Sequence, residues 1–169
     1  MRKITALLLI GILFSTTDSF GQTEKLKTVF IYNFTKYIDW PEAKTKSDFE
    51  IAFVGSTPLI GEMRQLAQTR KVGDQAIKIK EYQSISDIGQ AHIVIISPNK
   101  SSQLQSVLNA TKSKNTLVIT EGAGLVRKGS SISLIVQGNK LTYEISESNI
   151  KARSLNVSGH LLKLGNQIQ

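Results

Sequence analysis

Three short apolar runs, separated by segments with helical spacing, constrain the fold of this 169-residue chain most strongly. The runs are FEIAFV at 49–54, HIVII at 92–96 and TLVIT at 116–120. Each has the length of one strand, and each is followed by residues that favour a turn. Continuous apolar runs of this kind are typical of strands covered on both faces, so the chain is expected to form a mainly parallel sheet between helices.

The longest helix is predicted over 24–39, where apolar residues recur at helical spacing. We expect this helix to end at Trp40, because the residue before a proline, here Pro41, disfavours helical geometry. The residues expected to face the sheet are Leu26, Val29, Phe30, Phe34 and Ile38.

The C-terminal half predicts a hairpin after the last of the three apolar runs. Strands over 131–136 and 141–145 flank Gly138-Asn139, a pair that favours a tight turn. Shorter signals predict a half-exposed strand over 75–80 and helices after 58 and over 101–111. Together they predict a three-layer α/β fold, Rossmann-like or flavodoxin-like, with an antiparallel hairpin at the C-terminal edge of its sheet.

The N-terminus has the pattern of a secretory signal. Arg2 and Lys3 precede an apolar run over 4–14, which is shorter than the roughly 20 residues of a spanning helix. Cleavage is expected after Gly21, leaving a single domain over 22–169 outside the cytoplasm. An uncleaved membrane anchor is the alternative interpretation.

Composition narrows the chemistry that this domain can use. The chain has 0 cysteines, which excludes disulfides and cysteine metal sites, and its formal net charge is +8. This excess favours anionic partners such as lipid head groups or cell-wall polymers. Because the basic residues are scattered without aromatic interleaving, nucleic-acid binding is not expected.

Catalytic and cofactor motifs are missing from the sequence. Three turns, at 55–58, 97–99 and 121–124, are expected at the carboxyl ends of strands, where such folds bind ligands. None of them carries a nucleotide-binding fingerprint, and no nucleophile or metal motif occurs elsewhere. His92 and His160 are expected to be structural or exposed, and Glu121 is the best single carboxylate candidate. We therefore expect no enzymatic activity, cofactor or metal.

Polar and aromatic groups on the helices give the candidate binding residues. Asn33 and Lys36 lie three apart on one side of the first helix, and Arg153 could meet them to bind a carboxylate or another anionic ligand. The alternative is that Asn33 and Arg153 bond to each other and tie the two ends of the chain together. Tyr37 and Trp40 are expected to form an aromatic end that faces a partner, with packing in the core as the alternative.

Three segments resemble a known family of Gram-negative periplasmic proteins. They are LKTVFIYNFTKYIDWP at 26–41, AHIVIIS at 91–97 and GNKLTYEISESNIKARSLNVSGHLLKL at 138–164. With the runs between them, they resemble the YfiR/HmsC-like family. The resemblance implies a regulator that restrains a membrane-bound diguanylate cyclase by binding its external sensory domain. Members often carry a cysteine where this chain has Ala91, so redox control through disulfides is excluded here.

Two functional hypotheses follow from these observations. The first is a noncatalytic periplasmic regulator that binds an inner-membrane sensor, a diguanylate cyclase or a histidine kinase, through Asn33, Lys36, Tyr37, Trp40 and Arg153. The second is a periplasmic protein that binds a small anionic ligand or a peptidoglycan fragment. A homodimer is compatible with either hypothesis. An enzyme using Glu121 or His160 is the least favoured alternative.

Overall fold

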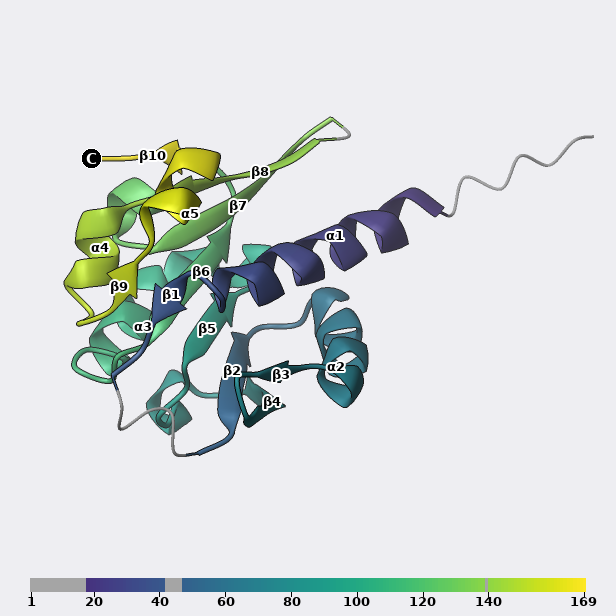
Figure 1. Ribbon diagram of the computed structural model, residues 1–169, viewed down its shortest axis with the longest axis horizontal. Coiled ribbons are helices and arrows are strands. Elements are labelled where there is room, and N and C mark those ends of the chain that lie inside the picture. The colour runs from purple at the N-terminus through teal and green to yellow at the C-terminus, as the bar shows by residue number, and fades with distance from the viewer. Residues whose placement is uncertain (1–17, 42–46, 139) are drawn as a thin grey trace, which may run out of the picture.

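The computed structural model describes residues 18–41, 47–138 and 140–169, and these form one layered α/β domain (Figure 1). The predicted charged start and apolar run of the signal lie outside the described residues. Among the described residues, no helix combines the length and the apolar character needed to cross a membrane.

An eight-stranded sheet in the order β10-β8-β7-β6-β5-β2-β4-β3 forms the centre of the domain. Neighbouring strands from β7 through β6, β5 and β2 to β4 are parallel, whereas β7–β8 and β3–β4 are antiparallel. The strands of this sheet are β2 (Phe49–Val54), β3 (Lys71–Val72), β4 (Gln75–Tyr82), β5 (Ile93–Ile96), β6 (Leu117–Glu121), β7 (Ile132–Gln137), β8 (Lys140–Ile145) and β10 (Asn166–Gln167). The predicted mainly parallel sheet with an antiparallel C-terminal hairpin is confirmed, although β10 adds two residues beyond the hairpin.

Helices cover both faces of this sheet. The helices are α1 (Asp18–Phe34), α2 (Leu59–Thr69), α3 (Leu104–Ala110), α4 (Glu147–Lys151) and α5 (Gly159–Leu164), with 3-10 turns η2 (Ile85–Asp87), η3 (Pro98–Gln103) and η4 (Val126–Lys128). Side chains on β2 alternate between the two faces: Phe53 belongs to the apolar cluster under α1, α2 and α5, and Val54 to the cluster under α3. Figure 1 shows α1 and α2 side by side over the sheet.

The first helix ends earlier than predicted. It stops at Phe34, because Thr35, Lys36 and Tyr37 turn back to bond carbonyls three residues earlier. The chain then forms β1 (Ile38–Asp39), which pairs antiparallel with β9 (Asn156–Val157) in a separate two-stranded sheet. A two-residue strand carries no periodic signal, so the sequence could not predict this pairing of the two ends of the domain.

The face that α1 turns inward also differs from the prediction. Phe34 and Ile38 are buried as expected, but Leu26 and Val29 are 40% and 47% exposed. Lys27 is buried in their place, together with Thr28 and Ile31. The expectation that Leu26 and Val29 face the sheet is therefore wrong, and two apolar side chains of α1 remain open to solvent.

Candidate interaction site

The outward face of α1 carries a continuous row of apolar and aromatic side chains. Leu26, Val29, Phe30 and Asn33 fall within an arc of about 100° when projected along helical geometry, and Tyr37 follows in the turn after the helix. We call these five residues the α1 strip. Leu26 and Val29 are exposed, and the other three are half-buried. An amphipathic helix on a sheet normally presents polar residues on this face, so the strip is unusual for a free surface.

One end of the α1 strip opens into a hollow of about 320 Å³ between α1, β8 and α5. The hollow, which we call the α1–α5 hollow, is lined by Phe30, Asn33, Phe34, Tyr37, Tyr143, Leu161 and Leu164. The ring of Tyr143 stands edge-on to Phe34, with centroids 5.0 Å apart, and its hydroxyl donates to the Leu161 carbonyl at 2.8 Å. Burial raises the pKa of Tyr143 to about 12. Leu164 is 62% exposed and forms the outer wall.

Basic residues are neighbours of the strip and of the hollow-lining residues in the sequence. Lys36 donates from Nζ to Asn33 Oδ1 at 3.1 Å and lies 4.9 Å from the centre of the Tyr32 ring. Tyr37 packs against the exposed ring of His160, with centroids 5.2 Å apart. Lys25, Lys36 and Lys163 are all exposed. Of the predicted binding residues, the structure therefore brings Asn33, Lys36 and Tyr37 together.

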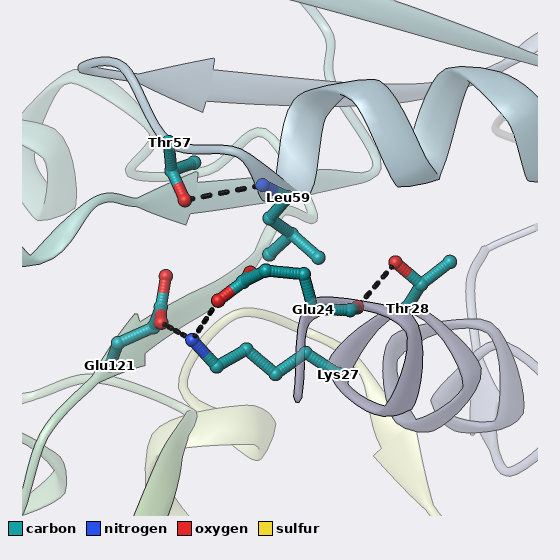
Figure 2. Close-up of polar contacts among 6 residues, drawn as sticks. All are labelled: Glu24, Lys27, Thr28, Thr57, Leu59 and Glu121. Atoms are coloured by element: carbon teal, nitrogen blue, oxygen red, sulfur yellow. Dashed lines mark hydrogen bonds and ion pairs between the residues drawn. The ribbon is translucent and has the colours of Figure 1, made fainter. Parts of the chain in front are cut away.

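A buried ion cluster fixes the orientation of α1 (Figure 2). Lys27 Nζ lies 2.8 Å from Glu24 Oε1 and 2.5 Å from Glu121 Oε2, which ends β6. Burial lowers the pKa of Lys27, but hydrogen bonds and charge attraction from Glu121 and Glu24 outweigh it and leave this pKa raised. The cluster lies beside the Thr57–Leu59 turn that opens α2 (Figure 2). Glu121, the predicted carboxylate candidate, is thus a structural partner of Lys27.

Trp40 is half-buried and packs against the core at the amino-terminal edge of the parallel strands. Its Nε1 donates to the His92 carbonyl at 3.3 Å, and its ring stands edge-on to Phe49 at 5.1 Å. The His92 ring stacks on Phe49 at 4.3 Å and accepts a hydrogen bond from the Glu50 amide. The expectation of a structural His92 is confirmed. A role of Trp40 in partner binding stays a prediction.

Arg153 is separated from the α1 strip. Its Nη1 donates to Thr111 Oγ1 at 3.0 Å and lies 3.4 Å from the Thr116 carbonyl, so it links the C-terminal segment to α3 and β6. Asn33 bonds Lys36 instead, and the predicted Asn33–Arg153 bond is not formed. Burial lowers the pKa of Arg153, and no carboxylate of the described residues pairs with it. A hollow of about 150 Å³ beside it is also lined by Lys112 and Asn149.

Two of the three predicted ligand turns meet at a polar hollow of about 260 Å³. Gly55 and Ser56 follow β2, Asn99 and Lys100 follow β5, and Tyr82 ends β4. The third turn, at 121–124, is occupied by contacts inside the domain, including a bond from the Gly124 amide to Glu144 Oε2. Within the described ranges, no group of three His, Asp or Glu side chains gathers as a metal site.

The sequence analysis missed the ion cluster and the hollow. Glu24 and Lys27 lie three apart, a spacing that places both on one side of a helix, and this signal could have identified half of the cluster. Their partner Glu121 is 94 residues away from Lys27, and no local pattern links them. Tyr143 lies in the predicted strand over 141–145, and only the tertiary arrangement places it and Leu164 around the same hollow as Phe30.

The fold and this surface define a three-layer α/β domain with exposed apolar side chains on its first helix. The chain belongs to the YfiR/HmsC-like family, whose family model matches residues 24–166. This family comprises periplasmic regulators in cyclic di-GMP signalling, and its domain is regulatory rather than catalytic.

The other comparisons bear on the fold alone. The crystal structure of an ABC domain in complex with L-Trp from Streptococcus pneumonia is similar, with a TM-score of 0.57 and 9% sequence identity. The match covers 86% of this chain and 60% of that chain. At this identity the likeness supports the α/β fold alone. No curated protein matches the sequence significantly.

Proposed function

We propose that the chain is a noncatalytic periplasmic regulator that binds the external sensory region of an inner-membrane diguanylate cyclase through the α1 strip and the α1–α5 hollow. The observation that carries this proposal is the exposure of Leu26 and Val29 on a helix whose opposite face is fully packed. Contiguous apolar surface of this kind is typical of protein-binding sites.

The chemistry of the site indicates what it would accept. The hollow is lined mainly by aromatic and leucine side chains, which suits an apolar anchor residue from the partner. The exposed Lys36, which bonds to Asn33, and the exposed Lys163, next to Leu164, favour acidic residues at the edge of the partner's binding surface. Asn33 supplies a polar group inside the hollow that could fix the orientation of the anchor.

The surroundings of the strip favour recognition over bond-making. Glu24 and Lys27, two charged residues of α1, are largely buried and paired with each other and with Glu121. This ion cluster and the pairing of β1 with β9 hold both ends of the strip in place. A rigid, preformed surface lowers the entropy lost on binding a partner.

Binding of the partner by a charged variant of the strip tests the proposal. The probe is the purified external region of the diguanylate cyclase encoded nearest to the gene for this chain. Replacing Leu26→Glu and Val29→Glu together should weaken binding by about 2–4 kcal/mol, the range of interface hot spots, because two carboxylates would need to be buried. In cells, the same variant should raise cyclic di-GMP to the level of a deletion.

The matched control places two glutamates at the same spacing on the opposite face of the sheet. Ser106→Glu and Asn109→Glu on α3 are exposed positions three residues apart, and this pair should bind the cyclase region like the unaltered chain. Equal binding by the strip variant and the control would reject the proposed surface. Absence of binding by the unaltered chain would reject the cyclase as partner.

Arg153 favours a second candidate function, the binding of a small anionic ligand such as a peptidoglycan fragment. Its guanidinium is largely buried, lacks a described carboxylate partner, and lies beside Lys112 in a hollow of about 150 Å³. A guanidinium in this state is suited to a ligand carboxylate. Muropeptides with free carboxylates should raise the melting temperature of the unaltered chain and not of Arg153→Gln. No shift with any muropeptide would exclude this function.

A further inference from the structure

The order of the parallel strands reverses between β2 and β5. From β2 the chain passes through α2 to β4 on one side, and it then returns to β5 on the other side of β2. Apolar residues of α2 belong to the cluster on one face of the sheet, and those of α3, which follows β5, belong to the cluster on the opposite face. The two connections therefore diverge beyond the ends of β2 and β5. Sheets of this type bind ligands in the crevice that such a divergence leaves.

A polar hollow of about 260 Å³ lies at this crevice. We call it the switch-point hollow, and its polar lining includes Ser56 after β2, Gln83 after β4, and Asn99, Lys100 and Gln103 after β5. Its volume is below the about 300–1,000 Å³ that is typical of sites for drug-sized ligands. The hollow therefore suits a ligand of few non-hydrogen atoms.

The two turns that form the hollow are held against each other. Gly55 has φ +90°, and a Cβ there would lie 2.6 Å from Lys100 Cγ and 3.0 Å from Asn99 Oδ1. The Ser97 amide and hydroxyl both donate to the Val54 carbonyl, at 3.0 Å and 3.1 Å. The hollow is thus formed before a ligand arrives, which lowers the entropy lost on binding.

The uncharged polar side chains of the hollow have no partner within the described part of the chain. Ser56, Gln83, Asn99 and Gln103 line the hollow, and none of their side chains makes a hydrogen bond to another described residue. An amide or a hydroxyl both donates and accepts hydrogen bonds. The hydroxyl groups of a ligand do the same and can pair with every one of these groups. An anion only accepts, so it would leave the amide oxygens facing negative charge.

The charged residues of the lining nearly balance. Lys100 and Glu81 both line the hollow, and Glu81 pairs with Arg64 at 2.5 Å. One lysine is therefore the single described cation of the lining itself. A phosphate group normally requires several cations or several free backbone amides.

The beginning of α2 does not supply those amides. The Leu59 amide donates to Thr57 Oγ1 at 3.4 Å, and the Ile60 amide donates to the Thr57 carbonyl at 3.2 Å. Pro58, which precedes the helix, has no N–H group. The charges and the backbone both favour a neutral ligand over an anion.

We propose that the switch-point hollow binds a neutral, hydroxyl-rich ligand with the size of one sugar ring, a monosaccharide or a similar polyol. The amides of Gln83, Asn99 and Gln103 bond to its hydroxyls, and Lys100 donates a charge-assisted bond to another. The hollow shares no lining residue with the α1–α5 hollow or with the hollow beside Arg153. This site is therefore independent of the proposed partner-binding surface.

A titration followed by NMR tests the site through its own side chains. D-glucose, D-mannose and D-galactose are the probes, and at least one should shift the amide signals of Gln83, Asn99 and Gln103 saturably. Asn99→Ala with Gln103→Ala should weaken binding about ten- to a hundred-fold, because two hydrogen bonds are lost. Gln68→Ala with Asn109→Ala removes two exposed amides outside the hollow and should bind like the unaltered chain. Absence of a saturable shift with every sugar, or equal weakening by both pairs, would overturn the proposal.

Inorganic phosphate separates a sugar site from an anion site. Phosphate should leave the Asn99 and Gln103 signals unchanged, and Lys100→Met should weaken sugar binding by about ten-fold through one lost charge-assisted bond. The variant should keep the melting temperature of the unaltered chain, because the Lys100 side chain makes no bond to another described residue. Saturable binding of phosphate that Lys100→Met abolishes would overturn the assignment to a neutral ligand.

Discussion

Lys27 Nζ lies 2.5 Å from Glu121 Oε2, and this contact joins the first helix to the end of the central strand β6. It also determines which face of α1 is exposed. Because Lys27 points inward to its two carboxylates, Leu26 and Val29 are turned toward solvent. The apolar strip and the buried ion cluster are therefore two consequences of one rotation of the helix.

Removal of the Lys27 charge should destabilise the domain strongly. Lys27→Met leaves the carboxylates of Glu24 and Glu121 buried without their cation, and each already has one oxygen without a hydrogen-bond partner. Breaking a buried pair on one side costs about 3–5 kcal/mol of unfolding free energy, measurable by urea denaturation. Lys151→Ala, which breaks an exposed pair with Glu147, is the control and should change stability by less than about 1 kcal/mol.

The strands of the sheet were predictable from sequence because burial on both faces removes polar residues from them. The runs at 49–54, 92–96 and 116–120 became β2, β5 and β6 within one residue at each end. The rotation of α1 was not predictable in the same way. Helical spacing alone assigns Leu26 and Val29 to the core, and a buried Lys27 is favourable only because Glu121 comes close through the fold.

The candidate site was predictable in part. Asn33, Lys36 and Tyr37 lie together at the end of α1 and in the turn after it, as their close spacing predicted. Arg153 was expected beside them, but its position depends on a turn after α4 that directs the side chain to Thr111. Sequence spacing within a helix thus predicted neighbours correctly, whereas contacts between separate elements required the structure.

Alkaline pH should weaken the domain through Tyr143. Its pKa is raised to about 12 in the folded chain, against about 10 for an unperturbed tyrosine. The folded state therefore retains a proton that the unfolded state loses, and stability falls between pH 10 and 12 by roughly 3 kcal/mol. Lys27, whose folded pKa is also raised, contributes a loss of the same sign in this range.

Denaturant titrations at pH 9, 10, 11 and 12 measure this effect, and Tyr143→Phe isolates it. The variant lacks the titrating hydroxyl, so its stability should decline less steeply above pH 10. It also loses the bond to the Leu161 carbonyl, worth about 1 kcal/mol at every pH. Parallel pH curves for the two proteins would show that Tyr143 does not titrate as its burial indicates.

The same substitution should have opposite effects at two glycines. Gly55 has φ +90°, and a Cβ there would lie 2.6 Å from Lys100 Cγ, so Gly55→Ala should cost about 1–2 kcal/mol. Gly61 lies inside α2 with no atom within 4 Å of an added Cβ. Gly61→Ala should stabilise the domain by about 1 kcal/mol through helix propensity. Urea denaturation of both variants measures whether each change in unfolding free energy is a gain or a loss. Destabilisation by Gly61→Ala would contradict the open space found there.

Double-mutant cycles should separate Arg153 from Asn33. Arg153 donates to Thr111, and Asn33 accepts from Lys36, so the two residues share no partner. The losses of unfolding free energy caused by Arg153→Ala and by Asn33→Ala should therefore sum to that of the double variant within about 0.5 kcal/mol, as expected for independent sites. For Arg153→Ala and Thr111→Val, the double variant should differ from the sum of the single variants by about 0.5–3 kcal/mol of unfolding free energy, because either change alone removes their shared hydrogen bond. Coupling in the first cycle and additivity in the second would restore the link between the chain ends that the sequence suggested.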